Sequence, residues 1–164
     1  MVGQGTPDAE LPEIGTALAP VLAVVPRDQQ PLLIAMAERL AAARYREWAA
    51  ATHDETFKRE LLECATREED IATRVEALYP DAAAVQQALL AAHPEVHEIN
   101  RTLFAGRPLA DQFSIQARGE RLGAATWRAF ARHTTDETAC ETFLACARLE
   151  EASAAVLEHV VGPS

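Results

Sequence analysis

The sequence predicts an all-α fold built mainly from four long helices. Its 164 residues contain only 7 glycines, and aromatic residues make up 5% of the chain, whereas alanine, leucine and glutamate are abundant. Apolar residues recur at helical spacing over long stretches, and no stretch shows the alternation of a half-buried strand. A chain of this length is expected to form one domain whose core needs neither disulfides nor a structural zinc.

An internal repeat also supports this prediction. Residues 37–78 align with residues 119–160 without a gap, and about two-fifths of the aligned pairs are identical. The sequence therefore predicts two copies of an antiparallel helical hairpin, at residues 28–79 and 110–161. A long crossover, residues 80–108, joins them.

The N-terminal segment, residues 1–27, begins with a polar stretch and is predicted to contain a short apolar helix within residues 13–25. The first long helix is predicted at residues 31–52. A tight turn follows it, and Asp54 is a suitable N-cap for the second long helix, residues 55–79. Two helices joined by so short a turn are antiparallel neighbours.

The crossover is predicted to contain one short helix, residues 82–92, followed by Pro94 and a break at residues 106–108. A connection of this length inside a small domain is typical of a crossover that runs along the full length of the helices. The third long helix is predicted at residues 109–133. The fourth, residues 136–161, follows a turn that repeats the first one.

Each long helix carries one glutamate near its middle, on the stripe that is predicted to face the core. These residues are Glu38, Glu68, Glu120 and Glu150. Within each hairpin the two glutamates lie about fifteen residues on either side of the turn, so all four should converge at one level. Burying an ionised carboxylate is costly without a cation, and no lysine or arginine lies on the four stripes. Carboxylate oxygens gathered around a dry cavity suit one or two divalent cations.

This pattern resembles the ferritin-like superfamily, especially its rubrerythrin and bacterioferritin branches. In that family a glutamate on the first helix precedes a tyrosine by seven residues, the second helix carries Glu-x-x-His, and the second half repeats both. Glu38 with Tyr45 matches the first element, and Glu120 with Trp127 is its counterpart in the second half. The resemblance covers residues 28–161 and implies a ferritin-like four-helix bundle whose glutamates, including the two of the Glu-x-x-His positions, hold two irons.

The chain departs from the family pattern at both histidines. Ile71 and Ser153 stand where the family has the histidine of Glu-x-x-His. His53 and His133 end their helices, roughly 20 Å from the glutamates by helical rise, so they cannot substitute. A site of four glutamates with water in the vacant positions remains, and its affinity for metal should be lower.

Two interpretations of the function stay open. In the first, the protein is a carboxylate-rich metal-binding protein that holds iron or manganese and oxidises its metal or reduces a peroxide. The alternative is a metal-free ferritin-like scaffold or interaction protein that has lost the di-iron site and keeps its glutamates protonated. Whether the protein is an enzyme is left open. Tyr45 and Trp127 are expected chiefly to pack the core.

Charge, cysteine content and the start of the chain lead to expectations about partners, localisation and oligomeric state. The net charge of −10 argues against nucleic acid and anionic membranes as partners, and no run of about 18 apolar residues is present. Cys64, Cys140 and Cys146 form an odd set without a Cys-x-x-Cys motif, which favours reduced thiols in the cytoplasm. The start of the chain lacks the basic region of a signal peptide. The storage ferritins' fifth helix is missing, so a small homo-oligomer is expected rather than a cage.

Overall fold

The regular structure is helical throughout the part of the chain that the computed structural model describes, residues 10–162. The predicted all-α class is therefore confirmed for these residues. The helices are α1 (Ile14–Leu22), α2 (Gln30–Ala51), α3 (Glu55–Glu76), α4 (Ala82–Ala92), α5 (Glu95–Phe104), α6 (Leu109–His133) and α7 (Glu137–Val161). Residues 1–9 of the predicted N-terminal segment lie outside the described residues.

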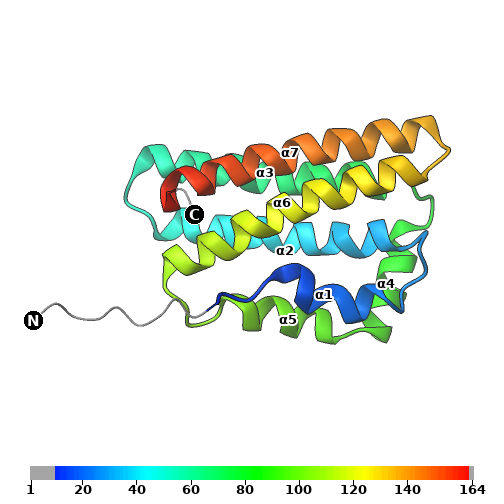
Figure 1. The fold of residues 1–164 in the computed structure, drawn as a ribbon, viewed down its shortest axis with the longest axis horizontal. Coiled ribbons are helices and arrows are strands. Elements are labelled where there is room, and N and C mark those ends of the chain that lie inside the picture. Colours follow the sequence, from blue (N-terminus) through cyan, green and yellow to red (C-terminus); the bar gives the residue numbers. More distant parts are fainter. Residues whose placement is uncertain (1–9, 163–164) are drawn as a thin grey trace, which may run out of the picture.

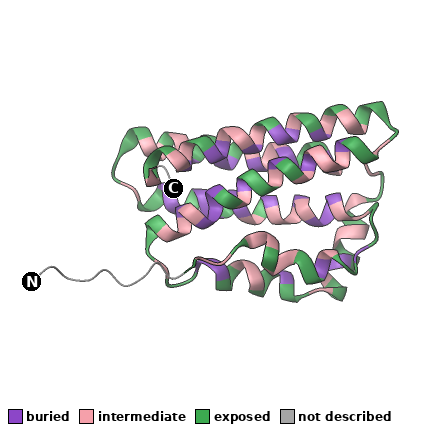
Figure 2. Ribbon diagram, in the orientation of Figure 1, coloured by how far each residue is buried: buried purple, intermediate pink, exposed green. Residues whose placement is uncertain are grey.

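Four long helices, α2, α3, α6 and α7, lie side by side and form the body of the molecule (Figure 1). The closest pairs are α2 with α3 and α6 with α7, and α3 also packs against α7. Buried residues are concentrated on the helix faces that point into this body, as the stripes predict (Figure 2). The predicted bounds of the other three long helices agree to within one residue, whereas α3 ends at Glu76 and not at residue 79. Pro80 disfavours helical geometry in the residue before it, so the chain leaves the helix early.

The two tight turns end one helix and begin the next in the same way. Thr52 and Thr134 have extended backbones that stop α2 and α6. Asp54 then accepts hydrogen bonds from the backbone N–H groups of Thr56 and Phe57, at 2.9 and 3.1 Å. Asp136 accepts one at the start of α7, from Ala139 N at 2.7 Å. These caps satisfy N–H groups that have no partner inside the helix, and each contributes about 1 kcal/mol.

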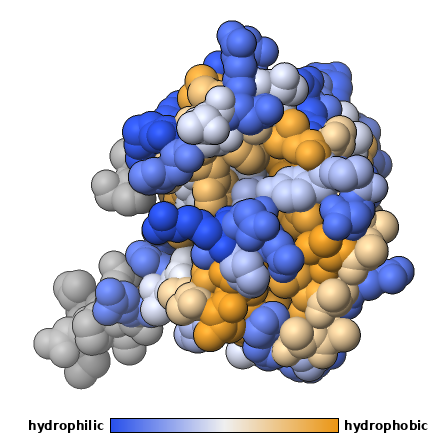
Figure 3. Space-filling model, turned by 90° about the vertical axis from the view of Figure 1, so that its right-hand side faces the viewer, coloured by the Kyte–Doolittle hydropathy of each residue, from blue (hydrophilic) through white to orange (hydrophobic). Residues whose placement is uncertain are grey.

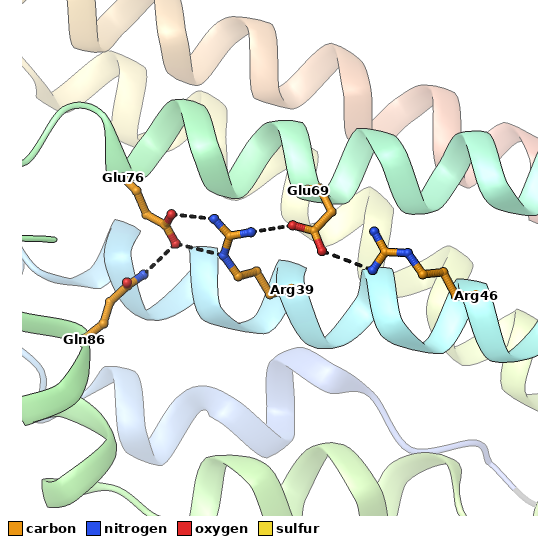
Figure 4. Close-up of polar contacts among 5 residues, drawn as sticks. All are labelled: Arg39, Arg46, Glu69, Glu76 and Gln86. Carbon is orange, nitrogen blue, oxygen red and sulfur yellow. Dashed lines mark hydrogen bonds and ion pairs between the residues drawn. The ribbon is translucent and has the colours of Figure 1, made fainter. Parts of the chain in front are cut away.

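Ion pairs link α2 and α3 on the outside of this hairpin (Figure 4). Arg39 donates two hydrogen bonds to Glu76, of 3.1 and 2.6 Å, and a third to Glu69. Arg46 also contacts Glu69, at 3.1 Å. Gln86 of α4 donates to Glu76, at 3.1 Å, and so attaches the crossover to the hairpin.

The same ion pairs recur between α6 and α7, about 82 residues further along the chain. Arg121 donates two hydrogen bonds to Glu158, of 2.7 and 2.6 Å, as Arg39 does to Glu76. Arg128 contacts Glu151 at 2.7 Å, as Arg46 contacts Glu69. Exposed ion pairs of this kind stabilise a fold by less than about 1 kcal/mol each, so their main effect is on the register of the two helices.

The crossover contains two short helices, of which the sequence predicted only one. The helix predicted at residues 82–92 is present as α4, which packs on α2. The prediction was wrong in leaving residues 95–104 without a helix. Pro94 stands at the N-cap of α5, where its missing N–H costs nothing. Val96, Leu103 and Phe104 are the buried side of this helix.

Helix α1 confirms that an apolar helix follows the start of the chain and lies on the long helices. It packs on α5 and α6, and two glycines allow the close approach to α6. A Cβ atom added to Gly119 of α6 would be 2.6 Å from Ile14 Cδ1, and one added to Gly15 of α1 would overlap the side chain of Leu122. The contact is therefore reciprocal, with one glycine from each helix.

The end of the molecule that carries α4 and the α6–α7 turn has a mixed surface, on which hydrophilic side chains interrupt the apolar areas (Figure 3). Within residues 10–162, no helix has both the length and the hydrophobicity needed to cross a bilayer.

We predict that Gly119→Val displaces α1 and destabilises the protein by about 1–3 kcal/mol, as overpacking of a tight contact does. Thermal unfolding would show a lower Tm. The matched control is Ala125→Val, which adds a branched residue at an exposed position of the same helix. A Tm equal to that of the control would show that α1 does not depend on this contact.

Candidate metal centre

The four glutamates predicted as ligands are all buried at the middle of the long helices. Glu38 of α2 is 8% exposed, Glu68 of α3 is 0%, and Glu120 of α6 and Glu150 of α7 are 1% each. Each lies on the inner stripe of its helix, between apolar neighbours one turn away on either side. The local sequence thus positions all four carboxyl groups in the core.

Three of the four glutamates come together. One oxygen each from Glu38, Glu68 and Glu150 lies within 4.8 Å of the others. Glu120 is outside this group of three but lines the same cavity as Glu38 and Glu150. Gly123 makes room for the group, because a Cβ atom there would be 2.8 Å from Cδ of Glu150.

Hydrogen-bond donors from the core reach three of the carboxyl groups. Oε1 of Glu120 accepts from Tyr45 Oη at 2.6 Å and from Gln116 Nε2 at 2.7 Å. Oε1 of Glu150 accepts from Trp127 Nε1 at 2.9 Å. Tyr45 and Trp127 therefore orient carboxylates as well as packing the core, a role that the sequence analysis did not assign to them.

Ser153 and Glu68 form the remaining contact. Ser153 Oγ lies 2.9 Å from Oε1 of Glu68 and donates to it, at the position where the ferritin-like pattern has histidine. The other oxygen, Oε2 of Glu68, is buried without any hydrogen-bond partner among the described residues. A buried, unpaired carboxylate oxygen costs several kcal/mol unless a proton or a cation meets it.

The structure also contains a buried cation that the sequence analysis missed. Arg44 is 7% exposed and donates to Gln116 Oε1 at 2.5 Å and to Asn100 of α5, while its guanidinium lies 3.6 Å from the centre of the Phe104 ring. It was overlooked because it lies beside the stripe of α2, and α5, which buries it, was not predicted. Gln116 links Arg44 to Glu120, so the guanidinium reaches the cluster through an amide and not through a direct ion pair.

Burial changes the acidity of the cluster. Desolvation, with the nearby Glu120 carboxyl contributing, raises the pKa of Glu38 to about 7. Desolvation and neighbouring carboxyl groups raise the pKa of Glu68 and of Glu150 well above its ordinary value. Desolvation lowers the pKa of Arg44 to about 10, which still leaves it charged at neutral pH. Without a metal, the cluster therefore tends to hold protons.

The residues present fit a hard divalent cation. The donors are carboxylate oxygens, one of which has no other partner, and they lie within 4.8 Å of one another. Two ligands with bonds of about 2.1 Å to one ion are at most about 4.2 Å apart, so a shift of less than about 1 Å by these side chains brings the oxygens around one ion. Thiolate ligation is disfavoured, because burial raises the pKa of Cys64 to about 11 and that of Cys146 to about 12. His53 lies in the turn between α2 and α3, and His133 is the last residue of α6. Both histidines are therefore at helix ends, whereas the glutamates are at the middle of the helices.

An apolar cavity of about 110 Å³ leads to the cluster from one side. Helices α1 and α5 form its outer wall, and α2 and α6 form its inner wall. Glu38, Glu120 and Glu150 line it, whereas Glu68 does not. Comparisons with family models, curated proteins and solved structures gave no match to this chain.

We predict that the metal-free protein loses stability as the pH rises. Glu38 has a pKa of about 7 in the folded protein and 4.5 as its ordinary value, so the folded state binds this proton more tightly. The stabilisation is fully present below about pH 4.5, is lost as the pH rises through about 7, and amounts to on the order of 3 kcal/mol. Urea unfolding in the presence of EDTA between about pH 4.5 and 8 measures it.

The variant Glu38→Gln should remove this part of the pH dependence, because a neutral amide replaces the carboxyl group. Glu47→Gln, an exposed change on the same helix, is the control. If Glu38→Gln and the wild type show the same dependence on pH, Glu38 does not hold a proton in the folded state.

Proposed function

We propose that this protein is a ferritin-like carboxylate metal protein in which Glu38, Glu68 and Glu150, with Glu120 beside them, bind iron or manganese. One observation carries the proposal. Carboxylate oxygens from three different helices lie within 4.8 Å of one another in the core, and no lysine or arginine among the described residues forms an ion pair with them. Such an arrangement is unfavourable for ionised carboxylates unless a cation is bound.

We further propose that the four long helices are a ferritin-like bundle of two repeated hairpins, at residues 28–79 and 110–161. The recurrence of the external ion pairs and of the Asp54 and Asp136 caps supports this. The packing of α3 against α7 joins the hairpins, and oxygens of Glu68 and Glu150 on these two helices lie within 4.8 Å of each other, which also supports the proposal.

The all-oxygen ligand set suits a hard divalent cation such as manganese, and the ferritin-like resemblance adds divalent iron; without imidazole ligands either metal would be bound weakly. Imidazole ligands are absent from the cluster, since Ile71 and Ser153 stand at the two expected histidine positions. Bound iron or manganese would supply one-electron chemistry toward oxygen or a peroxide. The chain's own residues hold the carboxylates in place through Tyr45, Trp127 and Ser153 and keep bulk water out.

A metal-free scaffold is the second candidate, and one observation favours it. Donors from Tyr45, Gln116, Trp127 and Ser153 already satisfy an oxygen of three of the four glutamates. If the glutamates also share protons, as their raised pKa values allow, the cluster needs no metal. The protein would then provide a helical surface for association and no chemistry.

We predict that Mn²⁺, or Fe²⁺ without oxygen, raises the Tm of the EDTA-treated protein, because a ligand that binds only the folded state stabilises it. At a concentration of about 100 times Kd the gain is about 2.7 kcal/mol. Replacing the four cluster glutamates by glutamine should abolish this gain. It should also leave the metal-free variant at least as stable as the wild type near neutral pH, since buried amides replace carboxyl groups.

The matched control replaces Glu69 and Glu151 by glutamine. These acids follow two of the cluster glutamates directly but lie in the external ion pairs, so this variant should respond to metal as the wild type does. Metal analysis of the freshly purified protein completes the test. A protein that is purified without metal and gains no stability from either ion would exclude the metal site and leave the scaffold.

A further inference from the structure

The cavity beside the cluster has apolar walls and an acidic floor. Helices α1 and α5 cover it, and Leu122, which is 47% exposed, marks where its lining reaches the surface. The apolar side chains of these two covering helices are Ile14, Leu18, Leu22, Val96, Ile99 and Leu103. A space of this kind is favourable for an alkyl chain, because apolar surface gains about 25 cal/mol per Å² on leaving water.

No positive charge among the described residues forms a direct ion pair with the carboxyl groups on the floor, and Arg44 is the nearest one, acting on Glu38 and Glu120 through space. Glu38 lines the cavity and is more than nine-tenths buried; its hydrogen-bonding neighbours are the carboxyl groups of Glu68 and Glu150, and no amide, hydroxyl or basic side chain of residues 10–162 donates to it. Arg44 also lines the cavity, but its guanidinium is engaged by Gln116, Asn100 and the Phe104 ring. Glu38 therefore lies between two acidic neighbours and a largely apolar space, and no basic side chain in the described part of the chain forms an ion pair with it.

We propose that this cavity binds a short primary alkylammonium ion, with the ammonium group on Glu38 and Glu120 and the chain between α1 and α5. An ammonium group has three N–H donors and one positive charge, which match carboxylate acceptors. An alcohol of the same length lacks the charge, and a carboxylic acid anion would be repelled. The volume of about 110 Å³ is somewhat smaller than the roughly 150 Å³ that holds benzene, so it suits a chain of about four carbons.

This inference goes beyond the proposed metal site and can be tested separately from it. The three glutamates close enough for a metal include Glu68, which does not line the cavity. Glu120 lines the cavity but lies outside that group of three. Loss of Glu68 should therefore affect metal binding, and loss of Glu120 should affect binding of the amine.

The test uses the full chain, treated with EDTA, and n-butylammonium as the probe, with calorimetry and thermal shift as readouts. We expect n-butylammonium to bind and to raise the Tm. Butan-1-ol, butanoate and methylammonium should each bind at least about tenfold more weakly, because they lack the charge, carry the wrong charge or lack the chain. Equal binding of butan-1-ol would overturn the proposal, since the cavity would then be only an apolar void. Absence of binding at about 10 mM n-butylammonium would overturn it as well.

Variants locate the binding site. Leu18→Trp fills the cavity from α1 and should weaken binding of n-butylammonium at least about tenfold, whereas Leu62→Trp, at an exposed position of α3, should not. Glu120→Gln should weaken it similarly, and Glu68→Gln should not. Equal loss in Leu18→Trp and Leu62→Trp, or no loss in Glu120→Gln, would place the amine elsewhere and overturn the proposal.

Mn²⁺ titrations of the same variants separate the two proposals. Binding of n-butylammonium without any response to Mn²⁺ would remove the metal site and support the amine site. A response to Mn²⁺ that Glu68→Gln abolishes, together with no binding of n-butylammonium, would retain the metal site and overturn the amine site.

Discussion

Burial of four carboxyl groups near the middle of the long helices is the constraint on which the rest of the structure depends. Each carboxyl group opposes folding unless a donor, a proton or a cation meets it. The neighbouring positions are filled accordingly, with hydroxyl, amide and indole donors from Tyr45, Gln116, Trp127 and Ser153. Gly123 supplies the space for one carboxyl group. Arg44 places a positive charge one amide away. The residues around the cluster thus supply the hydrogen-bond donors, the space and the nearby positive charge that buried carboxyl groups require.

The two hairpins have the same ion pairs on their outside, but different hydrogen-bond donors contact the glutamates in their cores. External ion pairs recur between them, whereas the donors to the carboxyl groups do not. Tyr45 donates across to the other hairpin, to Glu120, but its counterpart Trp127 donates within its own hairpin, to Glu150. Ser153 donates to Glu68, and its counterpart Ile71 has no polar group to donate. The four carboxyl groups therefore occupy four different environments, which can bias a site toward one metal position or toward one protonated group.

The long helices, their turns and the burial of the four glutamates could be predicted from the sequence. Helical periodicity and the capping aspartates gave the long helices and their turns, and a glutamate in phase with an apolar stripe indicated burial. The missed features depend on contacts between distant segments. Helix α5 was hidden by Pro94, whose effect depends on whether it starts a helix or interrupts one. Arg44 lies off the stripe, and only the packing of Asn100 and Phe104 against it makes it a buried residue.

The packing of the helices also determines the side from which the cluster can be reached. Helices α3 and α7 pack directly against each other, and Glu68 of α3 does not line the cavity, whereas Glu150 of α7 does. On the opposite side α1 and α5 cover α2 and α6, and the space that they leave is the cavity. The short helices are therefore more than a connection, because they determine the size and polarity of the approach to the carboxyl groups. A small molecule or ion entering by this route meets Glu38, Glu120 and Glu150, which line the cavity, before it reaches Glu68. The order in which an entering ion meets these glutamates is set by the packing of the helices, and it is the same for a metal ion and for an organic cation.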